Sequence, residues 1–223
     1  MKLSASILSA NFLRLGPDID RAYLAGCELI HLDVMDGHFV PNLAVGLGVV
    51  EALKGDIRMR KDTHLMVSNP ECLIDLFAAA GSDSITIHAE STPHHIRLLR
   101  DIKRTGKLAG IALTPETPVE AVRCALEEAD IVLQVAVCVG FGGQKAISMA
   151  FEKLLVLQKL KQQYGYTYEI QVDGGINGQT YKRALDFGAE VLVCGSTLFG
   201  SKDMAKTAAE LRAGTYVNTK MQE

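Results

Sequence analysis

The chain of 223 residues lacks the features that mark nucleic-acid-binding and membrane proteins. Its 23 basic and 26 acidic residues leave a net charge of −3, and no tract of Lys and Arg provides the positive surface that a polyanion requires. No apolar run approaches membrane-spanning length, and the N-terminus MKLSASILSANF has neither a long apolar core nor a small-residue cleavage site. We therefore expect no nucleic acid and no membrane as partners, and a small, locally bound ligand instead.

Cysteine is also scarce and unpatterned. The five cysteines are odd in number, lie far apart in the chain and never form a CxxC pair. This distribution argues against a disulfide framework and against a zinc site built from thiolates. We expect a protein of a reducing compartment and, with no leader segment in view, a cytoplasmic one.

Short apolar runs alternate with longer segments of helical periodicity along the whole chain. The apolar runs predict eight strands, at residues 3–8, 29–34, 63–67, 84–88, 108–113, 131–137, 168–172 and 191–194. The amphipathic segments predict helices at 15–25, 46–54, 70–80, 94–105, 118–128, 147–163, 179–187 and 203–213. Eight alternating units imply an α/β fold with a parallel sheet, and closing that sheet into a single (β/α)8 TIM barrel leaves no exposed edge.

The alternative architecture is an open, doubly wound sheet. Such a sheet should carry a glycine-rich turn after its first strand, but Ser-Ala-Asn-Phe follows Leu8 instead. No linker or low-complexity segment divides the chain, and 48% hydrophobic residues are ample for one large core. We therefore predict one barrel domain of eight parallel strands at residues 1–214 and a polar C-terminal tail at residues 215–223.

Polar side chains gather where the predicted strands end. In IHLDVMDGHFVPN, alternation along a strand projects His31 and Asp33 from the same side. His64 in THLMV and Asp173 in QVDGG end two further strands, and a barrel brings such strand ends to one cavity. Two imidazoles and two carboxylates suit one divalent ion such as zinc, iron(II), manganese or cobalt, although a core histidine bonded to a carboxylate is the simpler interpretation of the first pair. His88 and Glu90 end the fourth strand, where they either orient the ligands or form an ordinary polar rim.

Glycines follow three consecutive strands on the other side of the predicted barrel. They free backbone N–H groups to approach a ligand near helix N-termini, where phosphate is favoured, and barrels commonly hold phosphate after strands seven and eight. A plain turn explains any one of them, but three in succession indicate a phosphate site. The candidates are Gly140, Phe141, Gly142, Gly143, Gly174, Gly175, Gly195 and Ser196.

With these residues in view, the chain resembles the ribulose-phosphate 3-epimerase family from SASILSANF through VCGSTLFG, most specifically in IHLDVMDGHFVPN, THLMVSNPE, GFGGQK and VDGGIN. The resemblance implies a barrel that interconverts D-ribulose 5-phosphate and D-xylulose 5-phosphate in the pentose phosphate and carbon-fixation routes. It implies that Asp33 and Asp173 are the acid/base pair, and that Ser6 and His64 contact the ketose phosphate. It further implies the phosphate contacts just named, a homo-oligomer of two or more chains, and a divalent metal on His31, Asp33, His64 and Asp173.

The implied chemistry accounts for that set of residues. Inverting C3 of a ketose phosphate requires removal of a proton beside a carbonyl and return of a proton to the opposite face. Two carboxylates from different strands can serve the two faces, and a cation stabilises the charge of the enediolate. A phosphate clamp positions C3, and the loop from Gly140 to Gly143 is a candidate lid.

The sequence departs from the family next to that loop. Met35 and Met66 match the family's methionines near the substrate, but Val135 replaces the third, and Cys138 and Val139 replace a polar residue and a proline. Because Val139 lacks the fixed φ of proline, we expect a more mobile loop and weaker turnover.

Three other functions stay open at this point. One is an epimerase of the same family acting on another ketose phosphate, such as allulose 6-phosphate. A second is a phosphate-binding decarboxylase barrel, but the Asp-x-Lys of that class occurs here only as Asp101-Ile102-Lys103, in a predicted helix and followed by Thr105-Gly106. The third is an inactive barrel that only binds sugar phosphate, supported by Val135, Cys138 and Val139 alone.

Overall fold

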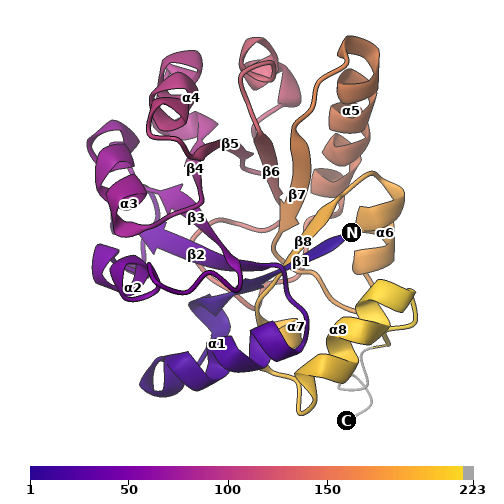
Figure 1. The fold of residues 1–223 in the computed structure, drawn as a ribbon. Coiled ribbons are helices and arrows are strands. Elements are labelled where there is room, and N and C mark those ends of the chain that lie inside the picture. Colours follow the sequence, from indigo (N-terminus) through magenta and orange to yellow (C-terminus); the bar gives the residue numbers. More distant parts are fainter. Residues whose placement is uncertain (218–223) are drawn as a thin grey trace.

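The computed structural model describes residues 1–217 and folds them into a closed barrel of eight parallel strands in sequence order (Figure 1). The strands are β1 (Lys2–Ser6), β2 (Leu29–Met35), β3 (Arg60–Met66), β4 (Ser84–His88), β5 (Leu108–Leu113), β6 (Ile131–Val135), β7 (Glu169–Asp173) and β8 (Val191–Cys194). β1 pairs with β8 as well as with β2, so the described sheet has no free edge. The predicted TIM barrel is confirmed.

Helices surround the strands and bury the outward-facing side chains of the barrel (Figure 1). The α-helices are α1 (Leu15–Leu24), α2 (Leu47–Ala52), α3 (Ile74–Ala80), α4 (His95–Arg104), α5 (Ser148–Tyr164), α6 (Tyr181–Asp186), α7 (Ser196–Phe199) and α8 (Met204–Ala213). Short 3₁₀ helices are η1 (Ile7–Ser9), η2 (Phe12–Arg14), η3 (Pro70–Cys72), η4 (Ala89–Ser91) and η5 (Val119–Ala125). On β2, for example, Leu32 and Val34 join the helix-packed core, while His31 and Asp33 face the barrel interior.

Element boundaries differ from the predicted ones at a few places. β3 begins at Arg60 rather than at residue 63, and β1 ends at Ser6 because η1 follows it. The segment predicted as a helix at residues 118–128 contains the 3₁₀ helix η5. The four-residue helix α7, directly after β8, has no counterpart among the predicted helices.

The barrel interior has a polar part and an apolar part. At its N-terminal end Glu169 forms ion pairs with Lys2 and Arg60, and all three are the first residues of their strands and keep part of their side chains exposed. On β5, β6 and β8 the buried side chains of Ala112, Leu133, Val135 and Val193 belong to one separate apolar cluster. The polar residues of the site lie mainly on β1 to β4, and Asp173 on β7 lies between the β6 and β8 parts of this cluster.

The last described residues of the chain pack against the rest of the barrel. α8 lies beside α1 (Figure 1), and the Tyr216 ring contacts the Tyr181 ring at 6.2 Å between centroids. Of the predicted tail at residues 215–223, positions 218–223 lie outside the described residues. Within residues 1–217, no helix combines the length and the apolarity that a bilayer crossing needs.

Candidate active site

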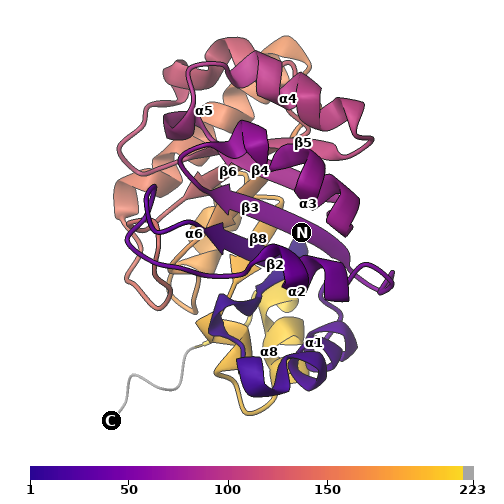
Figure 2. The ribbon, with the colours of Figure 1, turned by 90° about the vertical axis from the view of Figure 1, so that its left-hand side faces the viewer.

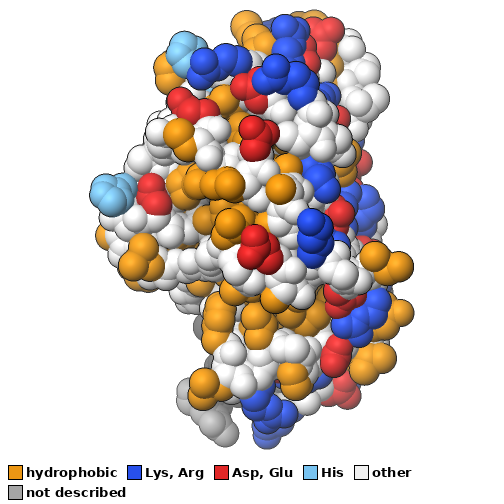
Figure 3. Space-filling model, turned by 60° about the vertical axis from the view of Figure 1, so that its left-hand side comes forward, with side chains coloured by type: hydrophobic (Ala, Val, Ile, Leu, Met, Phe, Trp, Pro, Cys, Tyr) orange, Lys and Arg blue, Asp and Glu red, His pale blue; other side chains and the backbone are white. Residues whose placement is uncertain are grey.

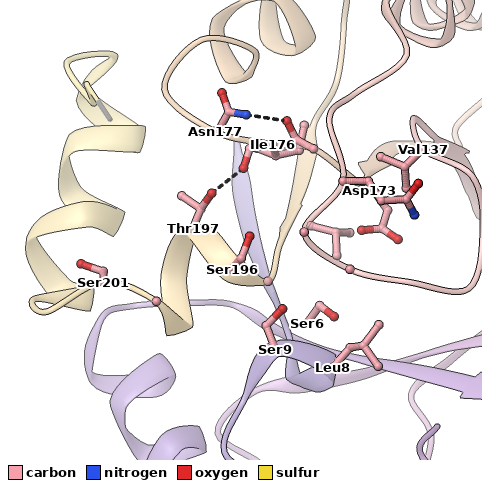
Figure 4. A pocket seen from close by; sticks show the side chains of 18 of the residues that line it. Ser6, Leu8, Ser9, Val137, Asp173, Ile176, Asn177, Ser196, Thr197 and Ser201 are labelled. Carbon is pink, nitrogen blue, oxygen red and sulfur yellow. Dashed lines mark hydrogen bonds between the residues drawn. The ribbon is translucent and has the colours of Figure 1, made fainter. Parts of the chain in front are cut away.

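A cavity of about 1520 Å³ opens at the C-terminal ends of the strands, to which the arrowheads of β2 and β3 point in Figure 2. This is the end of a TIM barrel where active sites lie. Asp33 from β2 lines it. Asp173 from β7 and Ser6 from β1 line it as well (Figure 4). β8 and β1 separate the two aspartate strands, so the two carboxylates approach the cavity from different directions.

His31, Asp33, His64 and Asp173 form one cluster whose four ligand atoms all lie within 4.8 Å of one another. The register of β2 and β3 creates most of it, because His31 lies opposite Asp62 and Asp33 lies opposite His64. His64 Nδ1 is 3.2 Å from Asp33 Oδ1 and 3.4 Å from His31 Nε2. The four residues predicted as a metal site are therefore neighbours in space.

The donor set fits a divalent metal ion. Two ligands of a tetrahedral ion with bonds of about 2.0–2.1 Å lie roughly 3.4 Å apart, which is close to the separations among His31, His64 and Asp33. Two imidazole nitrogens and two carboxylates also match the preferences of zinc, iron, manganese and cobalt. Two ring nitrogens that face each other at 3.4 Å cannot both carry a hydrogen, so a shared cation is a natural occupant of the space between them.

Buried groups hold the cluster in place from behind. Asp62 Oδ2 is 3.0 Å from His31 Nδ1, and Ser84 Oγ donates to Asp62 Oδ1 at 2.6 Å. On the cavity side, Ser6 Oγ donates to Asp33 Oδ2 at 2.7 Å. Asp62, itself held by Ser84, orients the His31 ring, and Ser6 orients the Asp33 carboxylate.

The environment shifts the pKa values of the two aspartates in opposite directions. Burial and the nearby Asp33 carboxylate raise the pKa of Asp173 to about 7. Burial also opposes ionisation of Asp33, but the adjacent His31 and His64 outweigh it and lower the pKa of Asp33 far below its ordinary value. For His31, burial is outweighed by Asp33 and Asp62, so its pKa is raised, whereas burial lowers the pKa of His64.

Glycines and hydroxyls line the other part of the cavity. Gly174 has φ of +97°, and a Cβ there would lie 2.5 Å from Val137 Cγ2, so only glycine lets the chain turn at this point. A Cβ on Gly195 would lie 2.6 Å from Ser9 Oγ, which shows how closely β8 and η1 approach each other. Figure 4 shows the Ser9 and Ser196 side chains near each other in this part of the pocket.

The predicted substrate-contacting and pocket residues reach this same cavity, with one exception. Its lining includes Ser6, Met35, Met66, Val135, Gly140, Phe141, Gly142, Gly143, Asp173, Gly174, Gly175, Gly195 and Ser196. His64 is fully buried beneath Asp33 and is not part of the lining, so its substrate contact stays a prediction. Val137 and Val139 extend the apolar side of the cavity beyond Val135.

The loop over the cavity is tied to its surroundings. Asn42 Nδ2 donates to the Gly140 carbonyl at 2.7 Å, and Gln144 Nε2 donates to the carbonyls of Cys138 and Phe141. The loop after β2 is ordered in turn by Asp36, which accepts from the backbone N–H groups of His38 and Phe39 among others. The reduced rigidity expected from Val139 stays a prediction.

Two residues of the site were not identified from the sequence, namely Asp62, which contacts His31, and Ser9, which lines the cavity. Asp62 precedes His64 by two positions, so the Asp-x-His spacing of β3 mirrors the His-x-Asp spacing of β2 and could have revealed it. Ser9 gave no comparable signal, because it lies in a 3₁₀ turn that the sequence predicted as the end of a strand and the beginning of a loop.

Comparison with known proteins assigns the chain to a family. The model of the ribulose-phosphate 3 epimerase family matches residues 2–199. The chain belongs to the ribulose-phosphate 3 epimerase family. A relative named ribulose-phosphate 3-epimerase from Bacillus subtilis is 40% identical over 213 residues, covering 95% of this chain and 98% of that protein. The chloroplastic ribulose-5-phosphate-3-epimerase of Arabidopsis thaliana is 41% identical over 213 residues, covering 95% of this chain and 76% of that protein.

Two solved structures of other proteins share the fold of this member of the epimerase family. The 3-hexulose-6-phosphate synthase of Salmonella typhimurium matches with a TM-score of 0.72 at 21% identity, covering 96% of this chain and 98% of that one. The 3-keto-L-gulonate-6-phosphate decarboxylase of Vibrio cholerae matches with a TM-score of 0.74 at 13% identity, covering 96% of each chain. At such identities the likeness establishes the barrel and nothing of the chemistry.

Proposed function

We propose that the protein is a metal-dependent epimerase that inverts C3 of D-ribulose 5-phosphate to give D-xylulose 5-phosphate. The observation that carries this proposal is the pair of aspartates, Asp33 and Asp173, at one cavity next to a glycine-rich region suited to phosphate. Relatives that are about 40% identical over nearly the whole chain bear the name of this activity. The strand positions of the two carboxylates let them approach a sugar from different directions.

Asp33 and Asp173 form an acid/base pair in this proposal. Asp33, whose pKa is lowered, is ionised at neutral pH and can accept a proton, whereas Asp173, with its pKa near 7, can hold one. One carboxylate takes the proton from C3 and the other returns a proton to the opposite face, through an enediolate of the sugar. In the reverse reaction the two residues exchange roles.

His31, Asp33, His64 and Asp173 would hold one divalent ion, which is zinc, iron, manganese or cobalt. When bound, such an ion stabilises the negative charge that develops on the sugar oxygens. The chain's own contribution is orientation, since Ser6 fixes one oxygen of Asp33 and Asp62 fixes the ring of His31. Ser6 also lines the cavity, where its hydroxyl can contact the ketose.

The glycine-rich half of the cavity would bind the phosphate. Backbone N–H groups of Gly142, Gly143, Gly174, Gly175, Gly195 and Ser196 can approach an anion closely because five of these six residues have no side chain. Binding energy from the phosphate then holds C3 between the carboxylates. The loop from Gly140 to Gly143 would close over the sugar and exclude water.

Deuterium exchange tests the proposed reaction directly. The metal-loaded protein in heavy water should convert ribulose 5-phosphate to xylulose 5-phosphate with deuterium at C3, and Asp33→Asn and Asp173→Asn should abolish the exchange. Ribulose 5-phosphate has no carboxyl group, so the decarboxylase alternative is tested separately with 3-keto-L-gulonate 6-phosphate, from which a decarboxylase would release carbon dioxide. A protein that catalyses neither reaction but binds the sugar phosphate would be a binding protein. A higher kcat/KM for allulose 6-phosphate than for ribulose 5-phosphate would change the substrate and leave the chemistry intact.

We also propose a cytoplasmic homo-oligomer. The five cysteines are unpaired, in keeping with a reducing compartment. Large apolar side chains are exposed around α2 and α3, namely Ile57 at 91%, Leu43 at 76% and Leu76 at 50%. Figure 3 shows hydrophobic side chains among charged ones on the face that bears these helices. Light scattering should give at least twice the chain mass, and a monomer at micromolar concentration would contradict this proposal.

A further inference from the structure

A chain of hydrogen-bonded polar groups continues from the four-residue cluster to the rim of β4 and β5. His64 Nε2 lies 2.9 Å from His88 Nε2, and the two rings stack with centroids 4.9 Å apart. His88 Nδ1 lies 2.9 Å from Glu90 Oε2. The other carboxylate oxygen, Glu90 Oε1, accepts the backbone N–H of Thr114 at 2.9 Å. His64 and His88 are both fully buried, so water does not compete for the bond between them, whereas Glu90 lies at the exposed rim.

We propose that Glu90, acting through His88, fixes the proton of His64 on Nε2 and thereby keeps Nδ1 available for a divalent cation. The proposal rests on the metal site of the proposed function and adds two positioning residues to it. Neither His88 nor Glu90 belongs to the four-residue cluster.

The positions of the hydrogens follow from the contacts. Glu90 as a carboxylate can only accept, so His88 Nδ1 must carry the hydrogen that it donates. His88 Nε2 is then a bare acceptor, and His64 Nε2 must carry the hydrogen between these two nitrogens. A neutral imidazole carries one N–H, which leaves His64 Nδ1 with a free lone pair. That nitrogen is the one that faces Asp33 and His31.

Asp33 favours the opposite arrangement when no cation is bound. Its Oδ1 lies 3.2 Å from His64 Nδ1 and would accept a hydrogen from it. In that tautomer Nδ1 could not bind a metal ion, and His88 would have to reverse and lose its hydrogen bond to Glu90. Glu90 therefore decides between a tautomer of His64 that binds metal and one that does not.

The rim of β5 fixes Glu90 in its turn. Lys153 from α5 donates to the carbonyls of Thr114, Pro115 and Thr117, which immobilises the segment whose N–H group binds Glu90. The second histidine of the cluster has a shorter version of the same support, because His31 Nδ1 contacts the Asp62 carboxylate directly. A carboxylate therefore supports His31 directly and His64 indirectly, through His88.

Glu90→Gln is the informative substitution because an amide has one acceptor oxygen where the carboxylate has two. If that oxygen accepts from Thr114, the NH₂ group faces His88 Nδ1 and reverses the chain of donors. We expect the dissociation constant for Zn²⁺, measured by competition with a chromophoric chelator, to rise 10- to 100-fold. Glu116→Gln removes the same charge from an exposed residue of the same rim and should leave the constant unchanged.

A second pair of variants separates tautomer control from packing. His88→Phe keeps a ring beside Phe39 but removes the acceptor for His64 Nε2, so Zn²⁺ binding should weaken at least tenfold. His88→Gln restores an acceptor oxygen and should stay within about threefold of the unmodified protein. If Glu90→Gln does not fold, this pair decides alone, because a packing role would affect Gln at least as much as Phe.

Three results would overturn the proposal: unchanged Zn²⁺ affinity in Glu90→Gln, equal affinities in His88→Phe and His88→Gln, or no Zn²⁺ binding by the unmodified protein. The readout needs no turnover. Weakened metal binding in a protein that does not epimerise ribulose 5-phosphate would support the positioning role and refute the proposed reaction. Epimerisation by the unmodified protein, together with unchanged metal affinity in the variants, would support the proposed reaction and refute the positioning role.

Discussion

Asp33 and Asp173 contribute carboxylates to the same cluster, yet the structure shifts their pKa values in opposite directions. Two adjacent histidines keep Asp33 ionised, while burial and the charge of Asp33 raise the pKa of Asp173 to about 7. The pair is coupled, so the charge on one partner sets the proton affinity of the other. Two residues of the same type therefore differ in proton affinity because of their neighbours alone, which is what the proposed acid/base pair requires.

The raised pKa of Asp173 predicts a pH-dependent stability of the metal-free protein. The folded state binds a proton that the unfolded state releases near pH 3.8, so this contribution is present below that pH and is lost as the pH rises through about 7. Asp173→Asn cannot ionise, and at pH 8 its chelator-treated form should be more stable than the unmodified one by on the order of 1–3 kcal/mol.

Urea unfolding at pH 5 and pH 8 measures that difference, which should be larger at pH 8. Asp186→Asn, an exposed position on α6, is the control and should show no such dependence. A stability gain for Asp173→Asn that is the same at both pH values would contradict burial of an ionisable Asp173. The gain should accompany complete loss of C3 exchange, which makes Asp173 a site where function costs stability.

Metal addition should stabilise the folded protein, and more so at high pH. The ligands must be deprotonated to bind an ion, and with the raised pKa of Asp173 this requires a pH above about 7. Zn²⁺ at 100 times the dissociation constant measured at pH 8 should add about 2.7 kcal/mol to the free energy of unfolding at that pH, and the same Zn²⁺ concentration should add less at pH 6. Thermal unfolding with and without Zn²⁺ at pH 6 and pH 8 tests this, and equal shifts at the two pH values would argue against Asp173 as a ligand.

Ser9 should contribute to phosphate binding. Its hydroxyl lies 2.6 Å from the position that a Cβ on Gly195 would occupy and 3.7 Å from the corresponding position on Gly142, and it lines the same cavity as these glycines. Ser9→Ala should raise KM for ribulose 5-phosphate and Ki for inorganic phosphate several-fold, with little change in kcat. Ser68→Ala, an exposed hydroxyl beyond β3, is the control. A change in kcat alone would remove Ser9 from the phosphate site.

The fold could be predicted from the sequence because the strands of this barrel carry local signals. The apolar runs predicted the bounds of β4, β5 and β8 without error, and the other strands within three residues at either end. β3 was predicted to begin late because Arg60, Lys61 and Asp62 look like loop residues, although Arg60 pairs with Glu169 inside the barrel. A charge can enter a buried strand when its partner comes from another strand, and periodicity alone carries no information on such partners.

Sequence motifs predicted the four residues of the cluster but not the side chains that orient them. His31, Asp33, His64 and Asp173 lie at strand ends, and the barrel then brings them together. The donor chain from His64 through His88 to Glu90 depends on which ring nitrogens face each other, which is set by side-chain orientation rather than by spacing. α7 was missed because four residues are too few to show a helical period.

Gly110 should be intolerant of any side chain for reasons of space. It lies opposite Thr86 in the pairing of β4 with β5, and a Cβ there would lie 2.1 Å from Thr86 Oγ1 and 3.1 Å from Thr86 Cα. The strands would have to separate, so Gly110→Ala should lower the free energy of unfolding by about 1–3 kcal/mol. Gly48→Ala, in α2 with nothing within 4 Å, should instead raise it by about 0.5–1 kcal/mol.

Thr86→Ala in the Gly110→Ala background distinguishes crowding from a lost backbone conformation. Removing Oγ1 relieves the shortest contact but leaves Thr86 Cβ, at 2.8 Å, in place as the alanine Cβ. Recovery should therefore be partial, and urea unfolding of the two single variants and the double variant gives the coupling between the positions. Strictly additive effects would mean that the two side chains do not collide and that β4 and β5 lie farther apart at this register than the barrel requires.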